Sequence, residues 1–141
     1  MASPPDSAAI DDALAAVLSN DATLMALIPD GVFFDEAPPG ATRFAQITLL
    51  DEVDVPVFGG RAYEDALYAV TVVMLSTVGA NDVAAAARID ALLDGQPLTA
   101  AGYTWMTTHR EARVNLTVPD DGDPAIRWYR RGGHYRVQMS I

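Results

Sequence analysis

The stretch that decides the fold covers nine residues and reads Leu67-Tyr68-Ala69-Val70-Thr71-Val72-Val73-Met74-Leu75. It is the longest run of β-branched, aromatic and aliphatic side chains in the chain, and such residues favour a pleated, buried surface. The even-numbered and odd-numbered positions form two faces, and neither face is polar enough to be left in water. We therefore predict a central strand that is covered on both sides.

A helix is predicted directly after this strand. The strand ends at residues 76–79, and Asn81 and Asp82 then offer two side-chain caps. The helix is expected over residues 83–94 and ends at Gly95, the residue type that best tolerates a left-handed C-cap. Its apolar face, rich in small side chains, consists of Ala85, Ala86, Ile89, Leu92 and Leu93. A strand, a tight turn and an amphipathic helix indicate an α+β domain.

The part of the chain before the central strand is predicted to be helical first and extended later. Residues 1–6 are expected to form a flexible, proline-rich leader, and residues 7–141 a single domain. Apolar spacing from Ser7 onward predicts a helix, followed by a second short helix that Pro29 stops. Short strands are expected over residues 32–34 and 44–50, with an acidic, proline-ended connection over residues 51–56.

The part after the central helix is predicted to be mostly extended. We expect a strand over residues 103–109, a partly extended segment over 110–119 and a turn over 120–124. The last element is expected over residues 126–141, with a bend at Gly132-Gly133. Its end alternates, and the side chains expected to point inward are Tyr135, Val137, Met139 and Ile141. The predicted fold class is α+β, a single mixed or antiparallel sheet packed by an N-terminal helix and a central amphipathic helix.

Composition excludes several classes of function. The chain has 141 residues, no cysteine, nine arginines, no lysine and 19 acidic residues, for a net charge of −10. A strongly acidic chain is a poor match for a nucleic-acid binder, whose affinity comes from cationic contacts with phosphates. No apolar run reaches the roughly 20 residues of a membrane helix, so no membrane partner is expected.

No motif nominates a catalytic group, a cofactor or a metal. The turn Asp120-Asp121-Gly122-Asp123 has oxygen ligands close together, but it lacks the spacing and the terminal glutamate of a calcium loop. His109 and His134 are far apart in sequence and have no matching ligand cluster, so each is expected to be a surface residue of a strand. Nucleophile-elbow, zinc-protease and phosphate-loop patterns are absent from the sequence. We therefore predict no enzymatic activity, no cofactor and no required metal.

An apolar segment before the central strand is the first candidate for an interface. It contains Val55, Val57 and Phe58 and ends in two glycines. One interpretation is a loop whose apolar residues pack beneath it. The other is an exposed finger that docks on a neighbouring molecule, because exposed apolar patches tend to mark interfaces. The flanking aspartates and glycines favour the finger.

A cluster of arginines near the C-terminus is the second candidate. Arg127, Arg130 and Arg131 are followed by Arg136, and Trp128, Tyr129 and Tyr135 are interleaved with them. Basic residues with aromatics can form a stacking groove for single-stranded nucleic acid. In a chain of net charge −10, a cationic edge that meets an acidic neighbour in a self-assembling ring fits better.

The order of these elements resembles the phage tail-completion or tail-terminator proteins over nearly the whole chain. The matching features are an N-terminal helix with a short apolar segment, a strand entry at Gly31-Val32-Phe33, an acidic-proline loop at Asp35-Glu36-Ala37-Pro38 and a glycine-bearing loop at Phe58-Gly59-Gly60-Arg61. The best matches are the central strand and the alanine-rich helix that ends Ile89-Asp90-Ala91-Leu92-Leu93-Asp94-Gly95. A closing strand over residues 135–141 also matches, whereas residues 110–131 depart from the pattern.

The resemblance implies a structural protein of the virion, made in the host cytoplasm and located in the tail or neck. Such a protomer forms a homohexameric ring on the head-proximal end of a long tail. The ring stops growth of the tail tube and presents a docking surface for the head–tail connector or stopper protein. Genome DNA passes through the lumen without specific binding, which agrees with the acidic charge.

Two alternatives stay open at this point. Another neck component, such as a head-completion or stopper protein, would share most of these features. A small-molecule-binding or enzymatic α+β domain, with a pocket between the sheet and the helices, belongs to a different class, and a fold alone does not exclude it.

Overall fold

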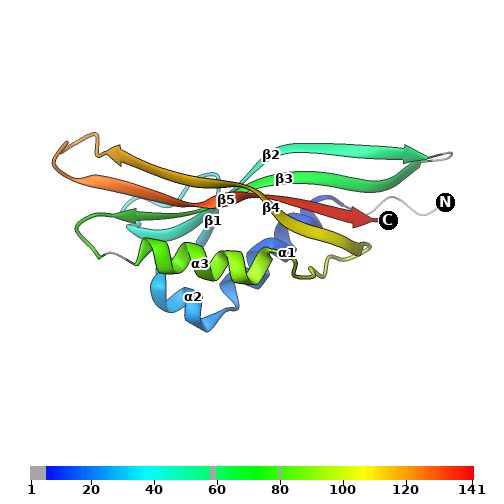
Figure 1. The fold of residues 1–141 in the computed structure, drawn as a ribbon, viewed down its shortest axis with the longest axis horizontal. Helices are drawn as coiled ribbons and strands as arrows, with labels where there is room; N and C mark the ends of the chain where they lie inside the picture. Colours follow the sequence, from blue (N-terminus) through cyan, green and yellow to red (C-terminus); the bar gives the residue numbers. More distant parts are fainter. Residues whose placement is uncertain (1–5, 58–59, 80) are drawn as a thin grey trace.

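The chain folds around one mixed sheet in a computed structural model that describes residues 6–57, 60–79 and 81–141, with the backbone alone at residues 56, 57, 60 and 61. The sheet has five strands in the order β1-β2-β3-β5-β4 (Figure 1). The elements are α1 (Ala8–Ser19), α2 (Ala22–Leu27), β1 (Val32–Phe34), β2 (Arg43–Val57), β3 (Gly60–Leu75), α3 (Asp82–Leu93), β4 (Thr104–Pro119) and β5 (Arg127–Ser140). The predicted α+β class is confirmed.

Strand β3 lies in the middle of the sheet, and it contains the stretch from which the fold was predicted. It pairs antiparallel with β2 on one side and with β5 on the other. Strand β4 pairs antiparallel with β5, whereas the short β1 pairs parallel with β2, which makes the sheet mixed. Two long hairpins, β2–β3 and β4–β5, are thus joined side by side along β3 and β5.

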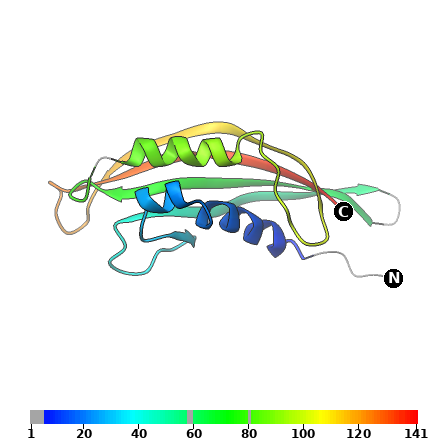
Figure 2. The same cartoon turned by 90° about the horizontal axis from the view of Figure 1, so that it is seen from below.

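All three helices of the described chain lie on one face of the sheet, as both views show (Figures 1 and 2). On β3 the side chains of Tyr68, Val70, Val72 and Met74 point toward this helical layer and are buried. On the opposite face only Val73 of the predicted stretch is buried, and its odd-numbered neighbours are half-buried. The prediction that both faces are covered is therefore wrong. Apolar composition indicates that a face avoids water, but not that the same chain supplies the cover.

Helix α3 confirms the predicted helix to within one residue at each end. Ala85, Ile89 and Leu93 are buried, and Ala86 and Leu92 pack against the core. Gly95 is left-handed at φ 72°, and its N–H donates to the Thr108 carbonyl at 2.7 Å. The predicted capping by two side chains is wrong, because Asn81 forms no side-chain cap and Asp82 is buried.

An ion pair between Asp21, at the start of α2, and Arg88 of α3 links the N-terminal helices to α3. The Asp21 carboxylate caps α2 by accepting from the Leu24 N–H at 2.9 Å. It also accepts from Arg88 of α3, at 2.7 and 2.8 Å. The hydrogen bond from Arg88, with help from the Leu24 N–H, lowers the pKa of Asp21 to about 2. The two predicted N-terminal helices are confirmed; they share the buried core with α3, and the ion pair is an additional link between α2 and α3.

Several predicted boundaries are wrong at the ends of the strands. Residues 51–56 are not a connection, because β2 continues to Val57 and pairs with β3 throughout. The strand predicted over residues 103–109 continues to Pro119. Strand β5 runs through Gly132-Gly133 without interruption, and Ile141, expected to point inward, is 45% exposed. The outer halves of these strands contain charged residues and prolines, which are not typical of strands, so the sequence pattern did not predict them. Such residues are nevertheless tolerated in half-exposed and edge strands.

Candidate interaction surfaces

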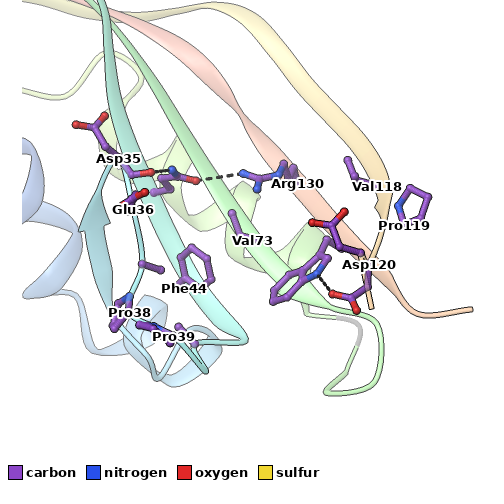
Figure 3. A pocket seen from close by; sticks show the side chains of 15 residues that line it. Asp35, Glu36, Pro38, Pro39, Phe44, Val73, Val118, Pro119, Asp120 and Arg130 are labelled. Carbon is purple, nitrogen blue, oxygen red and sulfur yellow. Dashed lines mark hydrogen bonds between the residues drawn. The ribbon is translucent and has the colours of Figure 1, made fainter. Parts of the chain in front are cut away.

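The sheet face opposite the helices carries a cleft of about 590 Å³. Its floor comes from the ends of four strands, with Phe44 of β2, Val73 of β3, Val118 of β4 and Trp128 of β5. The pairings Phe44↔Val73, Val73↔Arg130 and Trp128↔Val118 place these residues on one face, because directly paired side chains point to the same side. We call this the open-face cleft (Figure 3).

The floor of the open-face cleft is apolar and only partly shielded from water. Phe44 and Val73 are buried, whereas Val118 is 42% exposed. Arg130 crosses the floor and donates to the Gln46 side-chain oxygen at 3.1 Å (Figure 3). Gln46 in turn donates to the backbone carbonyl of Asp35, which ties the loop after β1 to the sheet. The cleft is therefore preformed by strands and held by side-chain hydrogen bonds.

The rim of the open-face cleft is acidic. Asp35 and Glu36 follow β1, and Asp120 and Asp121 lie in the turn between β4 and β5. The Asp120 carboxylate accepts from the Trp128 indole N–H at 2.8 Å and from two backbone N–H groups of its turn. These hydrogen bonds, that of Trp128 foremost, hold the pKa of Asp120 below its usual range. Asp120 thus keeps its negative charge at neutral pH.

The predicted apolar finger falls at the end of the β2–β3 hairpin. Val55 is half-buried and pairs with Tyr63, and Val57 pairs with Gly60. The Val57 side chain and all of Phe58 lie outside the described residues, so their interface role stays a prediction. We call residues 55–61 the hairpin tip. The hairpin extends from the body of the molecule at the end opposite the β4–β5 turn (Figure 1).

The predicted arginine cluster is dispersed by the structure. The residues lie on β5, which is paired on both sides and is not an edge strand. Arg127 is exposed, Arg130 points into the open-face cleft and Arg131 lies on the helical side, where it binds Asp82 at 2.9 Å. Arg136 binds Asp65 and Glu111. Arg131 and Arg136 therefore bind acidic residues of their own chain, where the sequence predicted a cationic edge that meets an acidic neighbour.

An acidic cluster that sequence analysis missed lies on the helical side of the β2–β3 hairpin. One carboxylate oxygen each from Glu52, Asp54 and Glu64 lie within 4.8 Å of one another, and Glu64 is buried. Ser7 donates to Glu64 at 2.9 Å, and Tyr68 donates to the neighbouring Asp11. Burial, and then a hydrogen bond with Glu64, raise the pKa of Glu52 to about 7. Only the pairing of residues 51–57 with β3 brings the cluster together, so no local motif reveals it.

In the predicted acidic turn, the carboxylates of Asp120 and Asp123 accept hydrogen bonds from backbone N–H groups of the same turn. Asp120 accepts from the N–H groups of Gly122 and Asp123, and Asp123 accepts from that of Ala125. His109 is half-buried and lies 3.8 Å from Glu111. No helix in the described ranges is long and apolar enough to span a membrane.

A second cleft of about 380 Å³ lies between α3 and the strands β4 and β5. It is lined by Asp90, Arg110, Arg113 and Arg131, among others. Arg131 is held by Asp82, and Arg110 lies 3.5 Å from Asp90. This is the place between sheet and helices that a small-molecule site would need.

Comparison with known proteins shows a shared fold. No family model and no curated protein matches the sequence. A chain in a solved structure described as "Virion of native gene transfer agent (GTA) particle" matches with a TM-score of 0.70 and 21% identity, covering 95% of this chain and 96% of that chain. Another solved structure, whose name describes no function, matches with a TM-score of 0.60 and 19% identity, covering 94% of this chain and 95% of that chain. Both likenesses extend over nearly the full length of each chain.

Proposed function

We propose that this protein is a structural component of a tailed phage or phage-like particle. In this proposal it forms a homohexameric ring that closes the head-proximal end of the tail tube and joins it to the head–tail connector. The observation that carries the proposal is the likeness over 95% of the chain to a protein of a gene transfer agent virion. The order of sequence elements independently resembles tail-terminator proteins.

The surfaces of the protomer support an assembly role. One face of the sheet has no helical cover in the described chain, and it carries exposed apolar side chains such as Leu116, at 54%, and Val53, at 51%. Exposed apolar area of this kind tends to mark protein–protein contacts. A net charge of −10 would let genome DNA slide through a ring lumen without being held. The proposal requires no catalysis, cofactor or metal.

Two alternatives can be tested beside this proposal. Another neck component would be compatible with the same fold and with the exposed apolar face of the sheet. A small-molecule-binding domain would use the cleft between α3 and the β4–β5 hairpin, where arginines could hold an anionic ligand. A monomer that binds such a ligand saturably in this cleft would favour that class.

The direct test is the oligomeric state and its dependence on the hairpin tip. The purified protein should form closed rings by electron microscopy and a hexamer by light scattering. Val57→Asp with Phe58→Asp should abolish the rings and leave the melting temperature of the protomer unchanged. The control is Val83→Asp with Met106→Asp, which adds the same charge at exposed apolar positions elsewhere, 64% and 43% exposed.

The same variants separate the outcomes in cells that make the particle. The hairpin-tip variant should give filled heads without tails, or tails of irregular excess length, and the control should give normal particles. A wild-type protein that stays monomeric at high concentration would overturn the ring. Infectious particles from the hairpin-tip variant would overturn the docking role of Val57 and Phe58.

A further inference from the structure

We propose that the free edge of β2 in one copy of the chain pairs with the free edge of β4 in the next copy, so that the sheet continues from subunit to subunit. The inference rests on the proposed ring, and it names the two strands that would meet between neighbours. We call residues 48–55 of β2 the β2 edge and residues 110–119 of β4 the β4 edge. The side chains of both segments belong to the described part of the structure.

Each edge has a side on which no described strand lies. In the order β1-β2-β3-β5-β4, strand β4 is the last and pairs only with β5. At the other end, β1 pairs with residues 45–47 of β2, so the β2 edge pairs with β3 alone among the described strands. An edge strand presents backbone N–H and C=O groups to which a strand of another chain can pair.

The directions of the two strands suit such a pairing. Strands β2 and β3, β3 and β5, and β5 and β4 are each antiparallel, so β2 and β4 run in opposite directions within the sheet. Two copies placed side by side, with their helices on the same face, would therefore join β2 to β4 as an antiparallel pair.

On the helical side, the two edges carry opposite charge. The β4 edge contributes Arg110 and Arg113 to the second cleft, which lies between α3 and the strands. Arg113 is exposed, and within the described residues it forms no ion pair. The β2 edge contributes Glu52 and Asp54 to the acidic cluster. Opposite charges across a contact select the partner and fix the register.

A cation from a neighbouring copy would stabilise the acidic cluster. Burial comes first, and Glu64, Asp54 and Asp11 then also raise the pKa of Glu52, so its charged form is disfavoured. A positive charge within about 4–6 Å favours the charged form of a carboxyl. Arg113 of the next copy would supply this charge, and the carboxylates would in turn neutralise the arginine.

On the open side, both edges present apolar side chains. Val53 of the β2 edge and Leu116 of the β4 edge are exposed. Over residues 52–55, acidic side chains on the helical side alternate with apolar ones on the open side, and over residues 112–118 polar and apolar side chains alternate in the same sense. A slip of one residue would place carboxylates against apolar side chains, so the match on both sides restricts the register.

The register that places Asp54 opposite Arg113 gives the contact a stagger. Within one copy, Arg113 aligns across the sheet with Val70 of β3, whereas Asp54 aligns with Glu64 of the same strand. Neighbouring copies are therefore shifted along the strands by roughly 20 Å at the rise of a β-strand. Across five strands, spaced roughly 4.8 Å apart, this shift corresponds to a strand tilt of about 40°. Closed sheets have tilts of roughly 35–45°.

The contact joins two different surfaces of the same molecule, so it repeats from copy to copy. Such a heterologous contact closes into a ring when the rotation per subunit allows it. A closed ring would leave neither the β2 edge nor the β4 edge exposed.

A cross-link tests the pairing directly, because the sequence contains no cysteine. The register that sets Asp54 opposite Arg113 also sets Val53 opposite Val114, and directly opposite side chains lie close enough for a disulfide. Val53→Cys and Val114→Cys proteins, made separately, are mixed and oxidised, and we expect disulfide-linked dimers only when both are present. The control replaces Val114→Cys by Met106→Cys, which is 43% exposed on the same strand but roughly 25 Å from Val114, and it should give no link.

A charge exchange tests the same contact without a cross-link. Arg113→Glu and Asp54→Arg should each raise the protein concentration for half-assembly about fivefold, since an exposed ion pair is worth up to about 1 kcal/mol. The two changes together should restore assembly. Arg113→Glu with Asp12→Arg has the same net charge but places the cation at an exposed position of α1, and it should not restore assembly.

The outcomes separate this inference from the proposed function. Rings that form normally, with no link between Val53→Cys and Val114→Cys and no rescue by the charge exchange, would overturn the strand pairing and leave the ring standing. A link or a rescue in an open chain of subunits would support the pairing and overturn the closed ring. An absence of any assembly would overturn both.

Discussion

Protonation of Glu52 couples folding to pH. Its pKa in the folded protein, about 7, lies above the ordinary value of 4.5, mainly because of burial beside Glu64, Asp54 and Asp11. A raised pKa means that the folded state binds this proton more tightly than the unfolded state does. The corresponding stability is complete below pH 4.5 and is lost as the pH rises through 7.

We predict that Glu52→Gln stabilises the protein at pH 8 relative to wild type and has little effect at pH 4.5. The expected gain is about 1 kcal/mol, because a partly exposed carboxyl shows only part of the effect that its shift implies. Urea unfolding at both pH values measures it. Glu36→Gln, which removes an exposed carboxyl elsewhere, is the control. An equal change at both pH values in Glu52→Gln would contradict the assignment.

Ile89 tests whether the helical layer packs as described. Its side chain is fully buried on α3. Ile89→Asp would bury a carboxylate without a partner, and we expect it to lower the free energy of unfolding by at least about 3 kcal/mol. Val83→Asp lies on the same helix at a position that is 64% exposed and should have little effect. Equal melting temperatures for the two variants would show that the buried face of α3 is wrongly assigned.

At the scale of elements, β3 and β5 approach each other closely at Gly132, which pairs with Thr71. A Cβ atom there would lie 2.1 Å from the Val70 carbonyl oxygen and 2.8 Å from the Thr71 Cα, both backbone atoms. The pairing of the two hairpins therefore requires a glycine at this position. The expected bend at Gly132-Gly133 is replaced by this close contact within a continuous strand.

We predict that Gly132→Ala separates β3 from β5 and lowers the free energy of unfolding by several kcal/mol, on the order of 3. The matched control is Gly122→Ala, where the added Cβ would meet only the Asp120 side chain at 3.4 Å. Thermal unfolding compares the two variants. A Gly132→Ala protein that melts like wild type would contradict the close approach.

The elements that sequence analysis predicted well are those whose neighbours are local. Helices α1 and α3 follow from apolar spacing, and Gly95 marks the end of α3 because a left-handed residue is needed there. The outer half of β2 was not predicted from the sequence. Asp51, Glu52 and Asp54 disfavour a strand locally, and this segment is a strand because it pairs with β3. The outer half of β4 was predicted only as a partly extended segment, whereas the structure has one continuous strand to Pro119.

The candidate site was predictable only in part. The apolar segment at Val55 and Val57 could be found from composition, and it falls at the end of a hairpin. The open-face cleft could not, because Phe44, Val118 and Trp128 come from strands far apart in sequence and meet only through the sheet order. Adjacent arginines of β5, Arg130 and Arg131, lie on opposite faces because side chains alternate along a strand.

At the scale of the whole molecule, the strand order has a consequence for the course of folding. Each hairpin joins strands that are neighbours in sequence, and isolated hairpins form within microseconds. The Leu75↔Trp128 pair, by contrast, closes a loop of about 50 residues that includes α3. We expect docking of the two hairpins to limit the folding rate. Until they dock, β3 and β5 present unpaired backbone to any other chain, and a net charge of −10 keeps such half-folded chains apart during that delay.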